Sequence, residues 1–435
     1  MQKTRLAPAV LPQSAQLAWA LNVGLSLFCA LIMFFNRFAL HLPYPYNFPF
    51  IPFQHWQDFR CFEPRFQHFH QLDVFSDAPQ LGPRFAYPAP AAVLYKAFYL
   101  FGHYGLAVFF LFNSALIVYL AVLLGRRMVS LGISTRVTAL FLASTILCSY
   151  PLWFDYLIGN IEVCIFLLVA FGILAFLRER FYLCAILIGI AVSLKLFPMV
   201  YFALFISRKK YRACALGILT AIVTNIVSLW LVCPSLSVAS AGIQKGLDGI
   251  RNIFMLRFMP EETAFDHSIF GLIKALGRHH YNGIMPSGLL TAYMACVALG
   301  GLALYFLVIR RLPLLNQIVA LSVASILLPP LSHDYTLIHL YPAYGLLVLF
   351  AIKARNNNLH VRGLLPAFVC LGILFSAQSQ IIIHNLGRSG QIKTLVLIAL
   401  LIISLRNRWP TPEEHADRLW APADSNVSSD RYVFS

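Results

Sequence analysis

One carboxylate stands out because it follows a run of aromatic residues. Asp58 lies in HWQDFRCFEPRF, directly after the apolar and aromatic approach NFPFIPFQHW. Partial burial against aromatic rings raises the pKa of a carboxyl group, which can then act as a general base toward a hydroxyl group. The alternative is an aspartate that only pairs with Arg60 or Arg65. Glu63 is the nearest competing carboxylate.

A lysine interrupts one of the most apolar stretches. Lys195 and Pro198 stand in FYLCAILIGIAVSLKLFPMVYFALFIS. A charge near the middle of a membrane costs about 2.5 to 3.5 kcal/mol on insertion scales, so such residues usually face the interior of a bundle. A lysine at a break between helices suits a phosphate, because it supplies a point charge beside free helix-end amides. The alternative is a structural ion pair with an acid such as Glu162.

Three more polar residues precede this stretch, in YPLWFDYLIGNIEVC. Asp155, Asn160 and Glu162 fall at the outer end of an apolar helix. Acids in a helix at the membrane edge are costly unless they face a cavity, so we expect at least one of the three to line a polar site. For Asp155, a side chain that reaches to the membrane surface is the alternative.

Two outer segments each contain a neighbouring Asp and His. MPEETAFDHSIFGLI carries Asp266 and His267, and PPLSHDYTLIHLYP carries His333 and Asp334. Histidine can donate to a phosphate or orient a base. The spacing differs from a catalytic zinc motif such as HExxH, so we predict no metal site. A loop histidine with neither role is the alternative for each pair.

The composition indicates which solvent surrounds these residues. The chain of 435 residues is 59% hydrophobic and only 11% charged, which is too apolar for a soluble protein of this length. Its 33 Lys and Arg outnumber 17 acids, and many of the bases fall in short clusters between apolar runs. That pattern is typical of a multi-pass membrane protein and not of a nucleic-acid-binding one.

The basic clusters also predict the path of the chain. Apolar runs long enough for spans recur from Leu17 to Leu405. If basic clusters face the cytoplasm, the run 183–206 must enter and leave on one side, because clusters at 178–180 and 208–212 flank it. We therefore predict a hairpin or broken helix pair with its turn near Lys195 to Pro198. The expected fold is an all-α polytopic bundle of about 10 to 12 transmembrane segments, with short broken helices.

The same reasoning divides the chain into two parts. Residues 1–405 form the expected membrane domain, with large outer loops at 36–103 and 233–286, and residues 406–435 form a polar cytoplasmic tail. Both termini are expected in the cytoplasm, in a multi-pass protein of the cell (inner) membrane. A disulfide between Cys61 and Cys233 stays open, since only these two cysteines fall in polar loops.

Taken together, these stretches resemble the C-type (GT-C) glycosyltransferases, and in particular family 87, polyprenol-phosphate-mannose-dependent alpha-mannosyltransferases. The resemblance rests on Asp58 with the later YPAP at 87–90, on the block from YLIGNIEVC to FISRKKYRA, on DHSIFGL and on PPLSHDYTLIHLYP. The chain departs from the family pattern where it has GNIE for GQxN, YPAP for a Pro-Pro pair, and Ser332-His333-Asp334 for a tryptophan with a paired acid and histidine.

The resemblance implies a transferase with a lipid-linked donor. It would move a hexosyl group, with mannose as the first candidate, from a polyprenyl-phosphate sugar to a lipid or glycan acceptor on the outer face, with inversion. Asp58 matches the catalytic base, Lys195 the lysine of the broken helix, and His333 the segment near the donor phosphate. The expected partners are membrane lipid, the polyprenyl-phosphate sugar and a glycan or glycolipid acceptor, with no cofactor and no nucleic acid. Candidate cavity-lining residues without a transferred role are Asp155, Asn160, Glu162 and His267.

A transporter or a flippase for lipid-linked sugars is the alternative from another class. Broken helices with a central charge also mark the substrate sites of carriers. Carriers often show an internal repeat, which this chain lacks, and its two large outer loops favour an enzyme with a cap. The enzyme hypothesis requires Asp58, Lys195 and His333 to converge on one outward-facing cavity.

Overall fold

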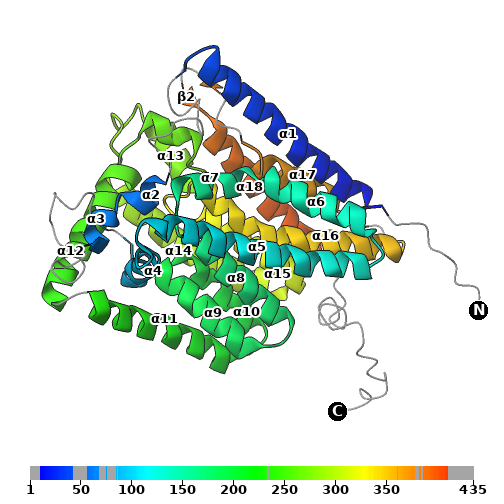
Figure 1. The fold of residues 1–435 in the computed structure, drawn as a ribbon, viewed down its shortest axis with the longest axis horizontal. Coiled ribbons are helices and arrows are strands. Elements are labelled where there is room, and N and C mark those ends of the chain that lie inside the picture. The colour runs from blue at the N-terminus through cyan, green and yellow to red at the C-terminus, as the bar shows by residue number, and fades with distance from the viewer. Residues whose placement is uncertain are drawn as a thin grey trace, which may run out of the picture.

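The fold is a bundle of helices, many of them long and apolar (Figure 1). The computed structural model describes residues 10–42, 56–67, 75, 85, 87–232, 235–359, 361–377, 382–383 and 386–409. Within these residues the strands are limited to the two-residue β1 (Ile382–Ile383) and β2 (Leu386–Gly387), which pair antiparallel. The predicted all-α class is confirmed.

Long and short helices alternate along the chain. The first half contains α1 (Gln13–Phe38), α2 (Gln57–Arg60), α3 (Glu63–Gln67), α4 (Ala89–Tyr99), η3 (Gly102–Tyr104), α5 (Gly105–Ser130), α6 (Thr135–Leu147), α7 (Tyr150–Ile158), α8 (Glu162–Leu177), α9 (Phe181–Leu194), η4 (Phe197–Tyr201), α10 (Phe202–Ser207) and α11 (Tyr211–Val232). The second half contains α12 (Leu236–Ile250), the π-turn η5 (Arg251–Met255), η6 (Pro260–Ala264), α13 (Ile269–Gly277), α14 (Ser287–Leu307), η7 (Ile309–Arg311), α15 (Leu314–Leu327), η8 (Asp334–Leu340), α16 (Tyr341–Asn356), α17 (Leu364–Leu374) and α18 (Ser389–Arg406).

The described part of the chain has six helices that are long and apolar enough to cross a membrane. A seventh crossing is formed if α6 and α7, which meet at a bend of 46°, count as one span. The described residues also contain five shorter apolar helices of 10–17 residues, with η4 and α10 counted as one. These lengths match the predicted mixture of full spans and short broken helices.

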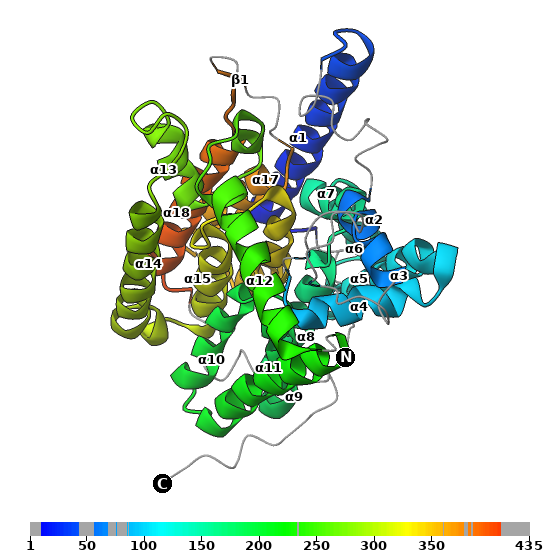
Figure 2. The ribbon, with the colours of Figure 1, turned by 90° about the vertical axis from the view of Figure 1, so that its left-hand side faces the viewer.

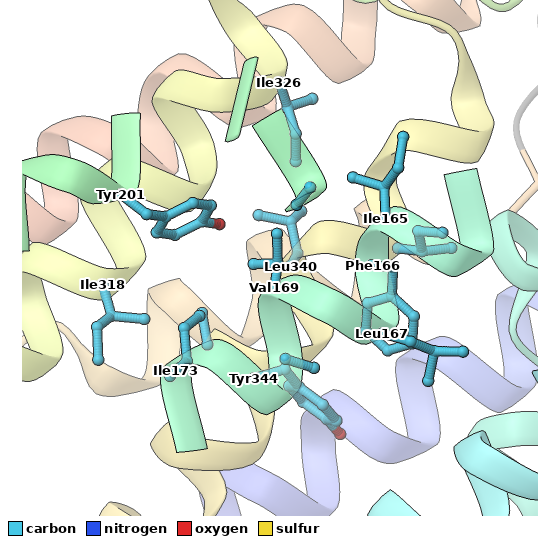
Figure 3. Close-up of a cluster of buried hydrophobic side chains, with 14 of the residues drawn as sticks. Ile165, Phe166, Leu167, Val169, Ile173, Tyr201, Ile318, Ile326, Leu340 and Tyr344 are labelled. Atoms are coloured by element: carbon cyan, nitrogen blue, oxygen red, sulfur yellow. The ribbon is translucent and has the colours of Figure 1, made fainter. Parts of the chain in front are cut away.

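Burial separates an inner layer from an outer layer. Every side chain of α15 is buried, whereas α1, α5, α11 and α14 expose large apolar residues such as Leu31, Leu111, Trp230 and Leu299. An apolar outer surface of this kind suits contact with lipid. α1 lies along an edge of the bundle, beside α17 (Figure 1 and Figure 2). At the centre, Ile165, Phe166 and Ile173 of α8 lie in one cluster with Ile318 and Ile326 of α15 (Figure 3).

The run 183–206 forms the predicted broken hairpin. α9 ends at Leu194, Lys195 has an extended backbone (φ −151°, ψ 146°), and η4 and α10 lead the chain back. The ring of Phe176 contacts both Phe181, where the hairpin begins, and Phe205, where it ends, at 5.2 and 5.6 Å. The two ends of the hairpin therefore lie together, and Lys195 occupies its tip.

Some predicted features fall partly or wholly outside the described residues. Cys233 is one of them, so its pairing with Cys61 stays a prediction. The polar tail from residue 410 onward is another, as are residues 43–55 and most of 68–86 in the first outer loop. The division into a membrane domain and a tail therefore also stays a prediction.

Candidate active site

Asp58 lies half-buried on the short helix α2, which docks on the end of α7. Trp56 has a left-handed backbone (φ 60°) and donates its N–H to the carbonyl of Leu157 at 2.5 Å. Gly159 ends α7 with φ 73°, and a Cβ added there would lie 3.0 Å from Cβ of Phe59. A glycine thus permits both the left-handed turn and the close approach of α2.

The Asn160 side chain connects Asp58 to the rest of the site. Its Nδ2 donates to Asp58 Oδ2 at 2.6 Å and lies 3.1 Å from the hydroxyl of Tyr87. Its Oδ1 accepts the backbone N–H of Glu162 at 3.0 Å. Asn160 is fully buried, so these bonds hold the Asp58 carboxyl group in one orientation.

The surroundings of Asp58 have opposing effects on its charge. Burial raises the pKa of the Asp58 carboxyl above its ordinary value, while the Asn160 hydrogen bond and the charge of Lys195 oppose that rise. A carboxylate with a raised pKa is a stronger base than an exposed aspartate. One oxygen accepts from Asn160, and the group has further acceptor capacity for a hydroxyl proton.

Lys195 pairs with a buried acid at the tip of the hairpin. Its Nζ forms an ion pair with Oε2 of Glu162, the first residue of α8. The other oxygen of Glu162 lies 2.7 Å from Nε2 of His339. Glu162 is fully buried, whereas the Lys195 side chain is 19% exposed. The ion-pair alternative for Lys195 is therefore what the structure shows, and the Lys195 side chain stays partly exposed.

Two tyrosine rings extend the cluster toward His333. Lys195 Nζ lies 5.5 Å from the ring centre of Tyr87 and 5.1 Å from that of Tyr335. The Tyr335 ring lies 5.7 Å from the ring of His333, which is half-buried. Contacts through Asn160, Tyr87 and Tyr335 thus place Asp58, Lys195 and His333 in one polar cluster, while their catalytic and binding roles stay predictions.

Asp155 and His267 occupy different places. Asp155 is fully buried on α7, within electrostatic range of Asp58, Glu162 and Lys195, so its side chain does not reach to the surface. His267 is also fully buried, but it contacts Asp334, 3.4 Å from its Nδ1. His267 therefore belongs to a second ionic cluster behind the turn that carries His333.

An apolar groove lies beside the polar cluster. α5, α6, α8 and α16 line it, with side chains that include Leu124, Phe141, Phe166, Ile173 and Tyr344. The ring of Phe166 lies 6.4 Å from the ring of His339, the partner of Glu162. One wall of the groove is thus one side chain away from the ion pair.

The family model for glycosyltransferase family 87 matches residues 85–331, more than half of the chain. The chain belongs to glycosyltransferase family 87. It is therefore a membrane glycosyltransferase, which decides against the transporter alternative. No curated protein and no solved structure matches the chain.

The family 87 match covers part of the polar cluster. Tyr87, Asn160, Glu162 and Lys195 fall within the matched residues. Asp58 precedes the match, and the turn with His333 follows it. The structure joins the matched and unmatched parts, because Asn160 bonds Asp58 and Lys195 lies against Tyr335.

Sequence reasoning missed two members of this polar cluster. His339 was one of several histidines in polar or apolar segments, and no local pattern connects it to Glu162. Tyr335 lies in PPLSHDYTLIHLYP, where His333 and Asp334 carry the stronger chemical signal. The signal that could have found His339 is the need of a fully buried Glu162 for more than one partner.

The described residues contain no group of three or more His, Cys, Asp or Glu side chains that could hold a metal ion. The expectations of no metal and no cofactor stay predictions.

Proposed function

We propose that the protein transfers a hexosyl group, with mannose as the first candidate, from a polyprenyl-phosphate sugar to a lipid or glycan acceptor. The observation that carries the proposal is one polar cluster in a family 87 chain, where a base with a raised pKa and an accessible lysine flank Tyr87 and Asn160. The transfer takes place on the outer face of the cell membrane.

The proposed reaction needs one base and a cationic place for the leaving group. Asp58 takes the proton from the acceptor hydroxyl while the oxygen of that hydroxyl bonds to the anomeric carbon of the sugar. The bond from that carbon to the phosphate oxygen breaks on the opposite side, which inverts the anomeric configuration. The phosphate leaves already ionised, so no acid has to protonate it.

Lys195 suits the phosphate even though it pairs with Glu162. An ammonium group has three donors, and Glu162 occupies one side of it. The side chain is partly exposed, and the rings of Tyr87 and Tyr335 lie near its ammonium group. A phosphate oxygen there would share the positive charge, and His333 lies next to Tyr335 to supply a further donor.

The apolar surroundings support a donor with a long lipid chain. The groove between α5, α6, α8 and α16 is lined by apolar side chains and lies beside the ion pair. A polyprenyl chain is as apolar as the membrane interior, so it can pass between the lipid and this groove at little cost in free energy. The lipid can thus remain in the membrane while its headgroup reaches Lys195.

A transfer assay with purified protein in lipid nanodiscs tests the proposal. A panel of labelled polyprenyl-phosphate hexoses is offered together with a membrane lipid extract as acceptor. We expect transfer from at least one donor, and a fall of about a hundredfold or more for Asp58→Asn, the lower end of the range for loss of a general base. The matched control Glu63→Gln, which removes the neighbouring carboxylate on α3, should stay within about threefold of the original rate.

Two results would contradict the proposal. Absence of transfer from every donor in the panel would remove the polyprenyl-phosphate sugar as substrate. Full activity of Asp58→Asn would remove Asp58 as the base while leaving the donor class intact.

A further inference from the structure

A second buried ion cluster lies behind the turn that carries His333. Lys393 Nζ on α18 lies 2.8 Å from Asp334 Oδ2, and both side chains are fully buried. Lys393 also lies over the ring of Tyr150, 4.8 Å from its centre. A lysine in an apolar helix is costly to bury without a partner, so this pair has to be formed in the folded protein.

The His267 side chain connects the pair to the second outer segment. Nδ1 of His267 lies 3.4 Å from the other oxygen of Asp334. Nε2 of the same ring lies 3.1 Å from the hydroxyls of both Ser332 and Thr336. The cluster therefore joins the segment before α13, the turn 332–336 and the first turns of α18.

Asp334 stands between the two residues of this turn that belong to the candidate active site. His333 has an extended backbone (φ −95°, ψ 165°), and Asp334 begins the 3-10 helix η8, in which successive side chains point in different directions. Asp334 accordingly points to Lys393 and His267, whereas Tyr335 lies over Lys195 and beside His333. Fixing Asp334 thus fixes the direction of both of its neighbours.

We propose that Lys393 is a positioning residue for the transfer reaction. Through its ion pair with Asp334, it holds the turn 332–336 so that Tyr335 lies over Lys195 with His333 beside it. Lys393 acts on the donor phosphate only through this turn. The inference rests on the proposed function for its effect on catalysis, but the tether itself can be tested without a substrate.

The first measurement is hydrogen exchange of the full-length protein in nanodiscs. Lys393→Met keeps the length and the apolar part of the side chain but removes its charge. We expect exchange of the amides in 332–336 to quicken at least tenfold. The matched control is Asn316→Ala, because Asn316 is fully buried and holds the far end of α18 through the carbonyls of Ser404 and Asn407. That variant should leave exchange in 332–336 within twofold.

The second measurement separates positioning from general stability. We expect Lys393→Met to raise KM for the polyprenyl-phosphate sugar at least tenfold while kcat changes less than threefold. In Asp334→Asn/Lys393→Met, the two losses should not add, because both substitutions break the same tether. Asn316→Ala should leave the donor KM unchanged.

The outcomes are distinguishable. Unchanged exchange in 332–336 would overturn the inference for any substrate, and quickened exchange with an unchanged donor KM would overturn the positioning role. If the original protein transfers no sugar, the proposed function fails, while quickened exchange still supports the tether. If Lys393→Met does not fold, the double variant takes its place, because it buries no unpaired charge. Exchange in 332–336 raised at least threefold in that variant supports the inference, and unchanged exchange overturns it.

Discussion

The pairing of Glu162 can be tested by a change of one atom. Glu162→Gln keeps the shape of the side chain and removes its charge. Glu162 is fully buried and accepts from two groups, Lys195 and His339. Hydrogen bonds to charged groups contribute about 1.5 to 3 kcal/mol each. Gln can keep one of them as a neutral bond, so we expect the free energy of unfolding to fall by about 2 to 4 kcal/mol.

The upper end of this range applies only if the remaining ammonium is buried. The Lys195 side chain is 19% exposed, so solvent offsets part of the cost of leaving it unpaired, and the lower half of the range is the closer expectation. The assay is reversible unfolding in mixed micelles with increasing SDS. The matched control is Glu179→Gln, since Glu179 lies exposed just beyond the other end of α8. A Glu162→Gln variant as stable as this control would refute the ionic cluster.

Three further predictions concern the candidate active site. Lys195→Met should lower kcat/KM for the donor at least a hundredfold, and Lys195→Arg should recover part of the loss. Initial rates at a donor concentration of a tenth of the original KM measure both effects. Burial raises the pKa of Asp58, so kcat/KM should rise with pH as the carboxyl group ionises and then level off. The midpoint of this rise should lie above the ordinary aspartate pKa of about 4. A profile that is flat down to pH 4 would contradict the role of Asp58 as base. Gly159→Ala should lower stability by about 1 to 2 kcal/mol, because the left-handed backbone disfavours a Cβ and the added atom would press on Phe59; activity should fall with it, and unfolding in SDS together with the transfer rate measures both effects.

The hairpin could be predicted because charge and hydropathy are local. Basic clusters on both sides of the run 183–206 required it to return to the side from which it came, and Pro198 placed the break. The residues at the tip follow from the same argument, so Lys195 was expected to lie inside the bundle. Its ion pair with Glu162 was one of two stated alternatives, since a nearby acid is the simplest partner for a buried lysine.

The partners across long sequence separations could not be predicted in the same way. Asn160 reaches Asp58 across 102 positions and Glu162 reaches His339 across 177. Such contacts depend on how α2 docks on the end of α7 and on how η8 packs beside α8, and no periodicity in either segment encodes that docking. His267 illustrates the limit, because its pattern suited a cavity but its ring faces Asp334.

The ionic cluster around Glu162 also has a consequence for biogenesis. Lys195 leaves the ribosome 33 residues after Glu162, whereas His339 leaves it much later, 177 residues after Glu162. The hairpin is too short to cross a membrane of about 30 Å by itself, so it cannot be stably inserted before its neighbours surround it. The last partner of Glu162 arrives with η8, when most of the helices have already been made. Completion of the site is thus a late step of assembly, and a chain truncated before η8 would present an incompletely paired carboxylate to the quality-control machinery of the membrane.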